Sequence, residues 1–267
     1  MLLGAENASV SVGGSRMDYA AFGRAERALI ILPGLGDGLR TVRGLALPLA
    51  LMYRMFARTH RVYVFSRREG IEMGCTTRDM AREQKLAMDA LGIARADVLG
   101  VSQGGMIAQH LAADYPDAVE NLVLAVTAAK AGDEVRAAVS GWMRMAEAGD
   151  YRGLMIDTAE RTYTERYLRR MRPLYPILAR MGKPKQMDRF LAMAQACLTH
   201  EARENHRITA RTLIIGGRED RIVGPDAART LARQIPSSEL FEYETYGHAV
   251  YEEAKDFNER VRRFLHG

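Results

Sequence analysis

The chain has 267 residues, of which 48% are hydrophobic and 27% charged, a composition typical of a folded globular protein rather than a disordered one. No apolar run approaches the roughly 18 residues of a transmembrane helix, and the N-terminal segment has no basic stretch before a long apolar core, so neither a membrane span nor a secretory signal is expected. The formal net charge of +5 is spread along the chain without a continuous basic face, so nucleic acid is not an expected partner.

Strand-like and helix-like segments alternate through the first half of the chain. Apolar, β-branched runs predict strands over residues 15–23, 28–32, 62–65, 96–101 and 122–126. Helical spacing occurs over residues 76–91 and 104–115, and Thr76 with Asp79 resembles a capping box at the start of the first of these helices. This alternation is typical of βαβ units and predicts a mostly parallel sheet covered on both faces.

The pattern changes between residues 130 and 207, where helical spacing dominates. Seven of the fifteen methionines of the chain occur there, at positions 143, 145, 155, 171, 181, 187 and 193. We interpret this segment as a helical cap, whose methionines either line a pliable apolar pocket or only pack the cap helices together. A basic stretch over residues 165–172 is interpreted as a solvated helical face.

After residue 207 the alternation resumes, with strands predicted over 211–215 and 240–243 and helices over 225–234 and 254–265. The sequence therefore predicts an α/β core formed by residues 1–129 and 208–267 and a cap formed by residues 130–207. The two cysteines, Cys75 and Cys197, lie far apart without CxxC spacing, so we expect reduced thiols and a cytoplasmic location. No cysteine–histidine cluster indicates zinc, and neither a metal nor a cofactor is expected.

The sequence GVSQGG, residues 100–105, follows a predicted strand and fits the pattern G-x-S-x-G. A strand that turns at once into a helix crowds its own backbone, and glycines two positions before and after Ser102 remove the side chains that would clash. The serine hydroxyl then stands clear of the sheet at the positive end of a helix. A glycine-rich turn without chemistry has the same pattern, so the motif indicates a nucleophile only if the chain also supplies a base and an acid.

His248 is the histidine best placed to act as that base. It follows the predicted strand 240–243 in the turn TYGH and precedes the last helix, which places it at the carboxyl edge of the sheet with Ser102. The other histidines are placed less well. His110 lies inside a predicted helix and His60 at the opposite end of the sheet, while His200 and His206 belong to the cap and its return and His266 to the terminus.

The acid is expected in the loop after the predicted strand 211–215. Glu219 and Asp220 compete there, and Asp220 is preferred because the step from Gly217 lets the loop turn back over the sheet edge. An aspartate that only caps a turn would give the same residue at this position. The predicted order along the chain is therefore Ser102, Asp220 and His248, with the cap between the serine and the acid.

Three separately placed motifs, LPGLGDG, GVSQGG and GGREDRIV…YGHAVYEE, together make the chain resemble the α/β-hydrolase superfamily, particularly its small cap-bearing esterase-like and C–C-hydrolase-like members. The resemblance extends from about Ser15 to the end of the chain. It implies an α/β-hydrolase fold with the helical cap inserted after the sixth strand. It also implies an oxyanion hole formed by the backbone N–H groups of Gln103 and, in the loop that matches the HG-x-G motif of the family, Leu35.

Two positions depart from the family pattern. Pro33 stands where relatives often have a histidine that braces the oxyanion loop, so we expect a different loop packing rather than a different chemistry. Ser66 stands where relatives often have an aspartate, and the sequence assigns this change no consequence. A serine at position 102 argues against dehalogenases and epoxide hydrolases, which use a carboxylate nucleophile.

The sequence thus predicts a serine hydrolase of the carboxylesterase type, which cleaves an ester or a related acyl compound of a small apolar molecule through Ser102, His248, Asp220 and an acyl-enzyme. Two alternatives stay open. One is cleavage of a carbon–carbon bond next to a ketone, or of a thioester or peptide, on the same triad. The other is a protein of the same fold that binds a small ligand with little turnover.

Overall fold

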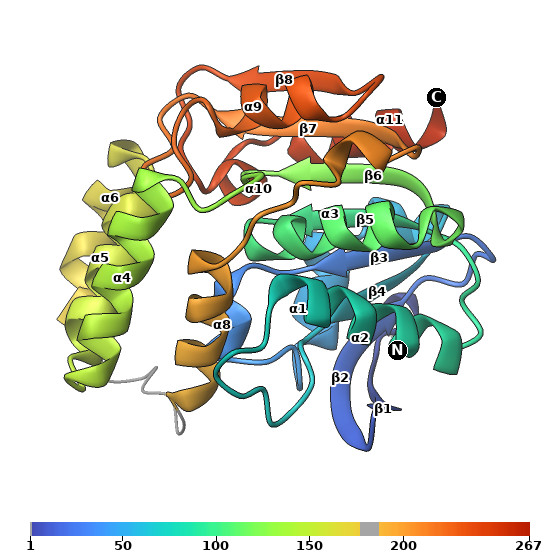
Figure 1. The fold of residues 1–267 in the computed structure, drawn as a ribbon, viewed down its shortest axis with the longest axis horizontal. Coiled ribbons are helices and arrows are strands. Elements are labelled where there is room, and N and C mark those ends of the chain that lie inside the picture. Colours follow the sequence, from blue (N-terminus) through green and yellow to red (C-terminus); the bar gives the residue numbers. More distant parts are fainter. Residues whose placement is uncertain (1, 177–186) are drawn as a thin grey trace.

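The computed structural model describes residues 2–176 and 187–267, and Figure 1 shows a central sheet with helices on both faces. The sheet has eight strands in the order β1-β2-β4-β3-β5-β6-β7-β8. The pairs β1–β2 and β2–β4 are antiparallel, and the other pairs are parallel. The strands are β1 (Glu6–Val12), β2 (Ser15–Phe22), β3 (Ala28–Leu32), β4 (Arg61–Phe65), β5 (Ala96–Val101), β6 (Val119–Ala125), β7 (Arg211–Gly217) and β8 (Glu239–Tyr243).

Helices cover both faces of the sheet, which explains the nearly continuous apolar runs of its central strands. Every residue of β3 and β5 is buried. One hydrophobic cluster joins the sheet to α2 (Thr77–Ala90), α3 (Gln103–Asp114) and α9 (Ala227–Gln234). A second cluster joins the opposite face to α1 (Ala46–Met52), α10 (Val250–Glu253) and α11 (Phe257–His266).

Between β6 and β7 the chain leaves the sheet and forms α4 (Asp133–Glu147), α5 (Tyr151–Thr162), α6 (Glu165–Met171) and α8 (Asp188–Leu198). These helices stand beyond the carboxyl ends of the parallel strands, with α8 nearest the core (Figure 1). We propose that they form the cap expected over residues 130–207. Met181 and the other residues from 177 to 186 lie outside the described residues.

The α/β-hydrolase fold expected from the sequence is confirmed, with three local differences. β1 was not predicted, because ENASVSV has few apolar residues and occupies a sheet edge, where only alternate residues are partly covered; the short helix α1 was not predicted either. The strand predicted through Val126 ends at Ala125, because Val126 has a φ of 45°. The predicted closing helix starts later than expected, at Phe257 in α11, because the backbone of Ala254 is extended, and the short helix α10 precedes it.

Candidate active site

The turn between β5 and α3 holds Ser102 in a backbone conformation that few L-residues adopt, with φ 54° and ψ −120°. The glycines around it are required by close packing. A Cβ on Gly100 would lie 2.6 Å from the carbonyl oxygen of Gly104, and a Cβ on Gly104 would lie 1.9 Å from the carbonyl oxygen of Leu32. The strained serine and its glycines therefore form the sharp strand–helix turn that the sequence predicted.

Ser102, His248 and Asp220 meet at the carboxyl edge of the sheet in one chain of hydrogen bonds. The Oγ atom of Ser102 lies 2.9 Å from Nε2 of His248, and Nδ1 of His248 lies 2.8 Å from Oδ2 of Asp220. A carboxylate only accepts, so Nδ1 carries the ring proton and Nε2 is free to accept the serine hydroxyl proton. The arrangement can therefore take a proton from Ser102 and hold the resulting imidazolium against a carboxylate.

Asp220 is fixed in place by its own loop. Its Oδ1 atom accepts hydrogen bonds from the backbone N–H groups of Ile222, at 2.8 Å, and Val223, at 3.0 Å, which leaves Oδ2 for His248. Asp220 is buried, whereas its sequence competitor Glu219 is exposed. The structure thus brings Asp220, and not Glu219, to the imidazole.

Of the other three buried histidines among the described residues, His60 and His200 have hydrogen-bond partners elsewhere, and His110 packs edge-to-face on the ring of His200. His60 contacts the carboxylate of Asp97 at 2.8 Å. His200 contacts Thr77 Oγ1 at 2.9 Å and the carbonyl oxygen of Ala128 at 3.1 Å, and burial lowers its pKa to about 3, so it stays neutral. Neither ring shares the hydrogen-bond chain of Ser102.

The two predicted oxyanion donors flank the serine. Gln103 is the first residue of α3, and Leu35 begins a short 3₁₀ turn, Leu35–Gly38, on the loop after β3. This loop lies directly against the serine, since a Cβ on Gly34 would be 3.1 Å from Cβ of Ser102. Among the loop and turn contacts of the described residues, neither amide donates to another backbone group, so both remain available to a bound oxygen.

A buried ion cluster, which the sequence did not predict, braces the oxyanion loop. Oδ2 of Asp37 accepts from the backbone N–H of Arg67 at 2.9 Å and from Nη2 of Arg189 at 2.6 Å. Arg67 in turn donates from Nη2 to the carbonyl oxygen of Pro33 at 2.5 Å. Burial lowers the pKa of the Arg67 guanidinium to about 10, with Asp37 opposing that shift, so the group is still cationic at neutral pH.

Both departures from the family pattern have defined contacts in the structure. The guanidinium of Arg67 holds the loop at Pro33, where relatives often have a bracing histidine. Ser66 accepts a hydrogen bond from the backbone N–H of Val42 at 2.8 Å and so fastens the segment that leads into α1. Asp37 lies within the LPGLGDG motif and Arg67 directly follows Ser66, but Arg189 comes from the cap, and no local pattern links it to them.

The cap helix α8 also contacts the turn at the serine. The side-chain amide of Gln103 donates to the carbonyl oxygen of Met193 at 2.6 Å and to Sγ of Cys197 at 3.0 Å. Burial raises the pKa of the Cys197 thiol to about 12, and both Cys197 and Cys75 are free thiols. Together with Arg189, these contacts tie α8 to both loops that carry the predicted oxyanion donors.

A cavity of about 460 Å³ opens between the core and the cap and has Ser102 and His248 in its wall. Its lining is mostly apolar and comes from the oxyanion loop, α1 and the cap, including Leu39, Leu49, Trp142, Met155 and Phe190. Within the described residues, Arg40 is the only cationic side chain of the lining, and it is exposed. Glu252, at the same wall, accepts a hydrogen bond from Tyr163 at 2.7 Å. The cavity therefore suits an apolar molecule.

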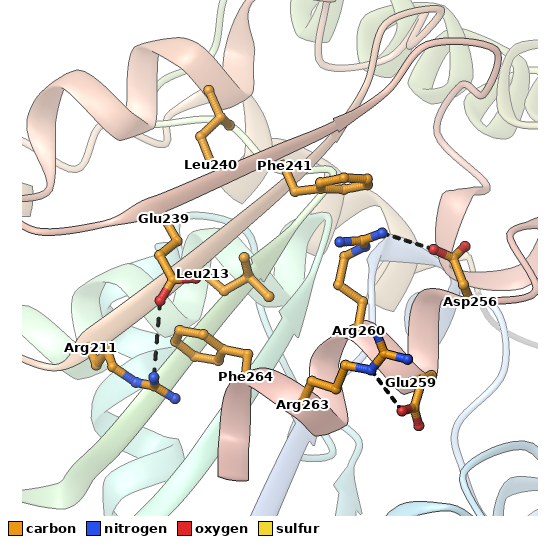
Figure 2. Close-up of a pocket in the computed structure, with 10 residues that line it drawn as sticks. All are labelled: Arg211, Leu213, Glu239, Leu240, Phe241, Asp256, Glu259, Arg260, Arg263 and Phe264. Carbon is orange, nitrogen blue, oxygen red and sulfur yellow. Dashed lines mark hydrogen bonds and ion pairs between the residues drawn. The ribbon is translucent and has the colours of Figure 1, made fainter. Parts of the chain in front are cut away.

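A second cavity, of about 370 Å³, lies between β8 and α11 and contains none of the predicted site residues. Figure 2 shows that its arginines are already engaged. Arg260 lies 3.3 Å from the centre of the Phe241 ring and pairs with Asp256, and Arg211 lies 4.1 Å from the centre of the Phe264 ring. Each arginine of this lining thus has a carboxylate partner.

Over residues 2–176 and 187–267, no three or more histidine, cysteine, aspartate or glutamate side chains gather as a metal site would require. In the same part of the chain, no helix has the length and apolar character needed to cross a bilayer.

Comparison with known proteins places this geometry in a family. A family profile described as alpha/beta hydrolase fold matches residues 27–255. A 2-hydroxy-6-oxononadienedioate/2-hydroxy-6-oxononatrienedioate hydrolase from a Pseudomonas species is 30% identical over 202 residues, which cover 69% of this chain and 68% of that protein. A pimeloyl-[acyl-carrier protein] methyl ester esterase from Neisseria meningitidis is 29% identical over 186 residues, which cover 65% of this chain and 70% of that protein.

The solved structure of an enol-lactonase from Burkholderia xenovorans superposes with a TM-score of 0.84, covers 97% of this chain and 100% of that chain, and is 22% identical. At this identity the likeness establishes the fold alone. The profile match, however, spans most of the chain and includes Ser102 and His248. The chain therefore belongs to the α/β-hydrolase fold family.

Proposed function

We propose that this protein is a serine hydrolase that cleaves a carboxylic ester or a related acyl compound, with Ser102 as nucleophile, His248 as general base and acid, and Asp220 as the residue that orients His248. The observation that carries the proposal is the continuous hydrogen-bond chain from Oγ of Ser102 to Oδ2 of Asp220, at distances of 2.9 Å and 2.8 Å, on a strained strand–helix turn.

In the proposed reaction, His248 takes the hydroxyl proton as Oγ of Ser102 attacks the carbonyl carbon. The backbone N–H groups of Leu35 and Gln103 stabilise the negative charge that develops on the carbonyl oxygen, at the positive end of α3. The imidazolium then gives its proton to the leaving group, which departs and leaves an acyl-enzyme. Water, deprotonated by His248, attacks the acyl carbon and releases the acid and the free serine.

Carbon–carbon bond cleavage is the second candidate, favoured by the activity that gives the relative of 30% identity its name. A dioate substrate such as the one in its name carries two carboxylates, which need cationic partners in a cavity. Here the lining offers Arg40 alone among the described residues, and that residue is exposed. The charge of the cavity therefore supports a neutral apolar acyl compound over a dicarboxylate.

A substrate panel and one substitution test the proposal. The panel contains p-nitrophenyl esters of increasing acyl length and a 2-hydroxy-6-oxo-dienoate. We expect turnover of the esters, and a loss of several orders of magnitude in kcat for Ser102→Ala. A fluorophosphonate probe should modify the wild-type protein at Ser102 and leave the variant unmodified. Ester turnover that survives in Ser102→Ala would contradict the proposal, and faster turnover of the dienoate than of every ester would favour the second candidate.

A further inference from the structure

The segment around α1 exposes apolar side chains beside the entrance of the active-site cavity. Leu47 is 52% exposed, Leu51 50% and Met52 38%, and Pro48 between them is also exposed. The opposite side of the helix is held against the core, because Ala46 and Ala50 are buried in the second hydrophobic cluster. The exposed side of α1 is therefore a fixed feature of the fold rather than a consequence of a loose segment.

Four exposed arginines, Arg40, Arg43, Arg54 and Arg58, flank this helix. No aspartate or glutamate occurs between residues 38 and 68. Across the described residues, none of the four arginines forms a salt bridge, whereas the exposed Arg263 of α11 pairs with Glu259. We call the four arginines, together with Leu47, Pro48, Leu51 and Met52, the α1 surface.

The α1 surface is continuous with the cavity. Arg40 and Met52 belong to both, and Leu45, Leu49 and Tyr53 of the same segment continue inward along the cavity wall. Ser102 and His248 line the same cavity. A molecule held at the α1 surface is therefore at the entrance of an apolar path to the serine.

We propose that the α1 surface docks the protein on an anionic lipid bilayer and that the substrate is a lipid-borne acyl ester, which enters the cavity along α1. Leucine and methionine side chains enter the interfacial layer of a bilayer, and arginines bind its phosphates. A second copy of the chain fits less well, because a symmetric contact would bring the same four arginines face to face. The docking is independent of the proposed function, whereas the substrate class, a lipid-borne acyl ester, rests on the proposed function.

Co-sedimentation with vesicles tests the docking. The probes are vesicles of phosphatidylglycerol and vesicles of phosphatidylcholine. We expect the wild-type protein to bind the former and not the latter, and to dissociate in about 1 M salt, where the Debye length falls to about 3 Å. In the triple variant Arg43→Gln/Arg54→Gln/Arg58→Gln, each lost arginine should lower the partitioning of the protein onto phosphatidylglycerol vesicles by about fivefold at low salt. Leu47→Gln/Leu51→Gln should lower it by at least about tenfold.

The matched control is Leu86→Gln/Arg233→Gln, which removes an exposed leucine from α2 and an exposed arginine from α9, on the other face of the sheet. It should bind vesicles like the wild type. Circular dichroism shows whether each variant is folded, and all variants should hydrolyse a short soluble ester within about twofold of the wild-type rate, since none of the changed residues lines the cavity.

Three results would overturn the docking: wild-type protein that binds neither kind of vesicle, equal binding to both kinds, or unchanged binding by the variants of the α1 surface. A dimer that those variants dissociate, in a protein that binds no vesicles, would assign the surface to a second copy instead. If the wild-type protein binds vesicles but shows no ester turnover that depends on Ser102, only the proposed function is contradicted, and with it the substrate class.

Discussion

Substitution of Asp37 tests whether the buried ion cluster holds the oxyanion loop. The Asp37 side chain is 1% exposed and that of Arg189 is 15% exposed, while Arg67 is 4% exposed as a residue. Asp37→Ala removes the carboxylate and leaves two guanidinium groups with little access to water. Removing one partner of a buried ion pair costs about 3–5 kcal/mol, and the partial exposure of Arg189 favours the lower end of that range. We therefore expect a loss of about 3 kcal/mol in the free energy of unfolding.

Urea denaturation measures this loss, and ester kinetics measure its effect on the site. Because Arg67 also holds Pro33, the loop that carries the Leu35 N–H should shift, and kcat should fall by up to about 100-fold with little change in KM. Asp37→Asn, which keeps an acceptor and the volume, should fall between the wild type and Asp37→Ala. In the matched control, Glu201→Ala breaks an ion pair with side chains 49% and 76% exposed, which solvent screens, so it should lower the free energy of unfolding far less than Asp37→Ala does. If Asp37→Ala costs no more than this control, the cluster does not brace the loop.

Three further predictions concern the triad, the serine turn and the pH dependence of stability. Asp220→Asn should reduce kcat for a soluble ester by about 10⁴ at neutral pH with the fold retained, because the amide permits the wrong imidazole tautomer; a loss below about tenfold would contradict that role. Gly104→Ala places a Cβ 1.9 Å from the carbonyl oxygen of Leu32 and should prevent folding or lower the melting temperature sharply, whereas Gly141→Ala, whose Cβ meets nothing closer than 4.0 Å, should leave stability equal or higher. Burial lowers the pKa of His200 from 6.5 to about 3, so between these values only the unfolded chain binds a proton there. The free energy of unfolding should therefore decrease as the pH is lowered from 6.5, by up to about 1.4 kcal/mol per pH unit. His200→Gln should remove this contribution, and equal losses in both proteins between pH 7 and pH 5, measured by urea denaturation, would disprove it.

Much of the fold and of the candidate site could be predicted from local sequence signals. The apolar runs of β3 and β5 are buried along their whole length, so their pattern is the direct result of helices on both faces of the sheet. Ser102 could be located because its strained turn requires glycine at positions 100 and 104, where no side chain fits. His248 and Asp220 could be placed because the carboxyl ends of parallel strands share one edge of the sheet.

Other features depended on contacts between segments far apart in the chain. β1 forms at a sheet edge through its pairing with β2, although its own sequence has few apolar residues. Arg189 lies 152 residues after Asp37, and only the packing of α8 against the oxyanion loop brings the two charges to 2.6 Å.

The sequence by itself determined the class of fold, the strained serine and the edge of the sheet where an imidazole and a carboxylate could join it, because each of these follows from the spacing of residues within a short segment. Tertiary structure alone decided that Arg67 holds the oxyanion loop at Pro33 and that α1 turns Leu47 and Leu51 to solvent. Each of these depends on how the burial of apolar surface orients whole elements against one another, which no local pattern specifies.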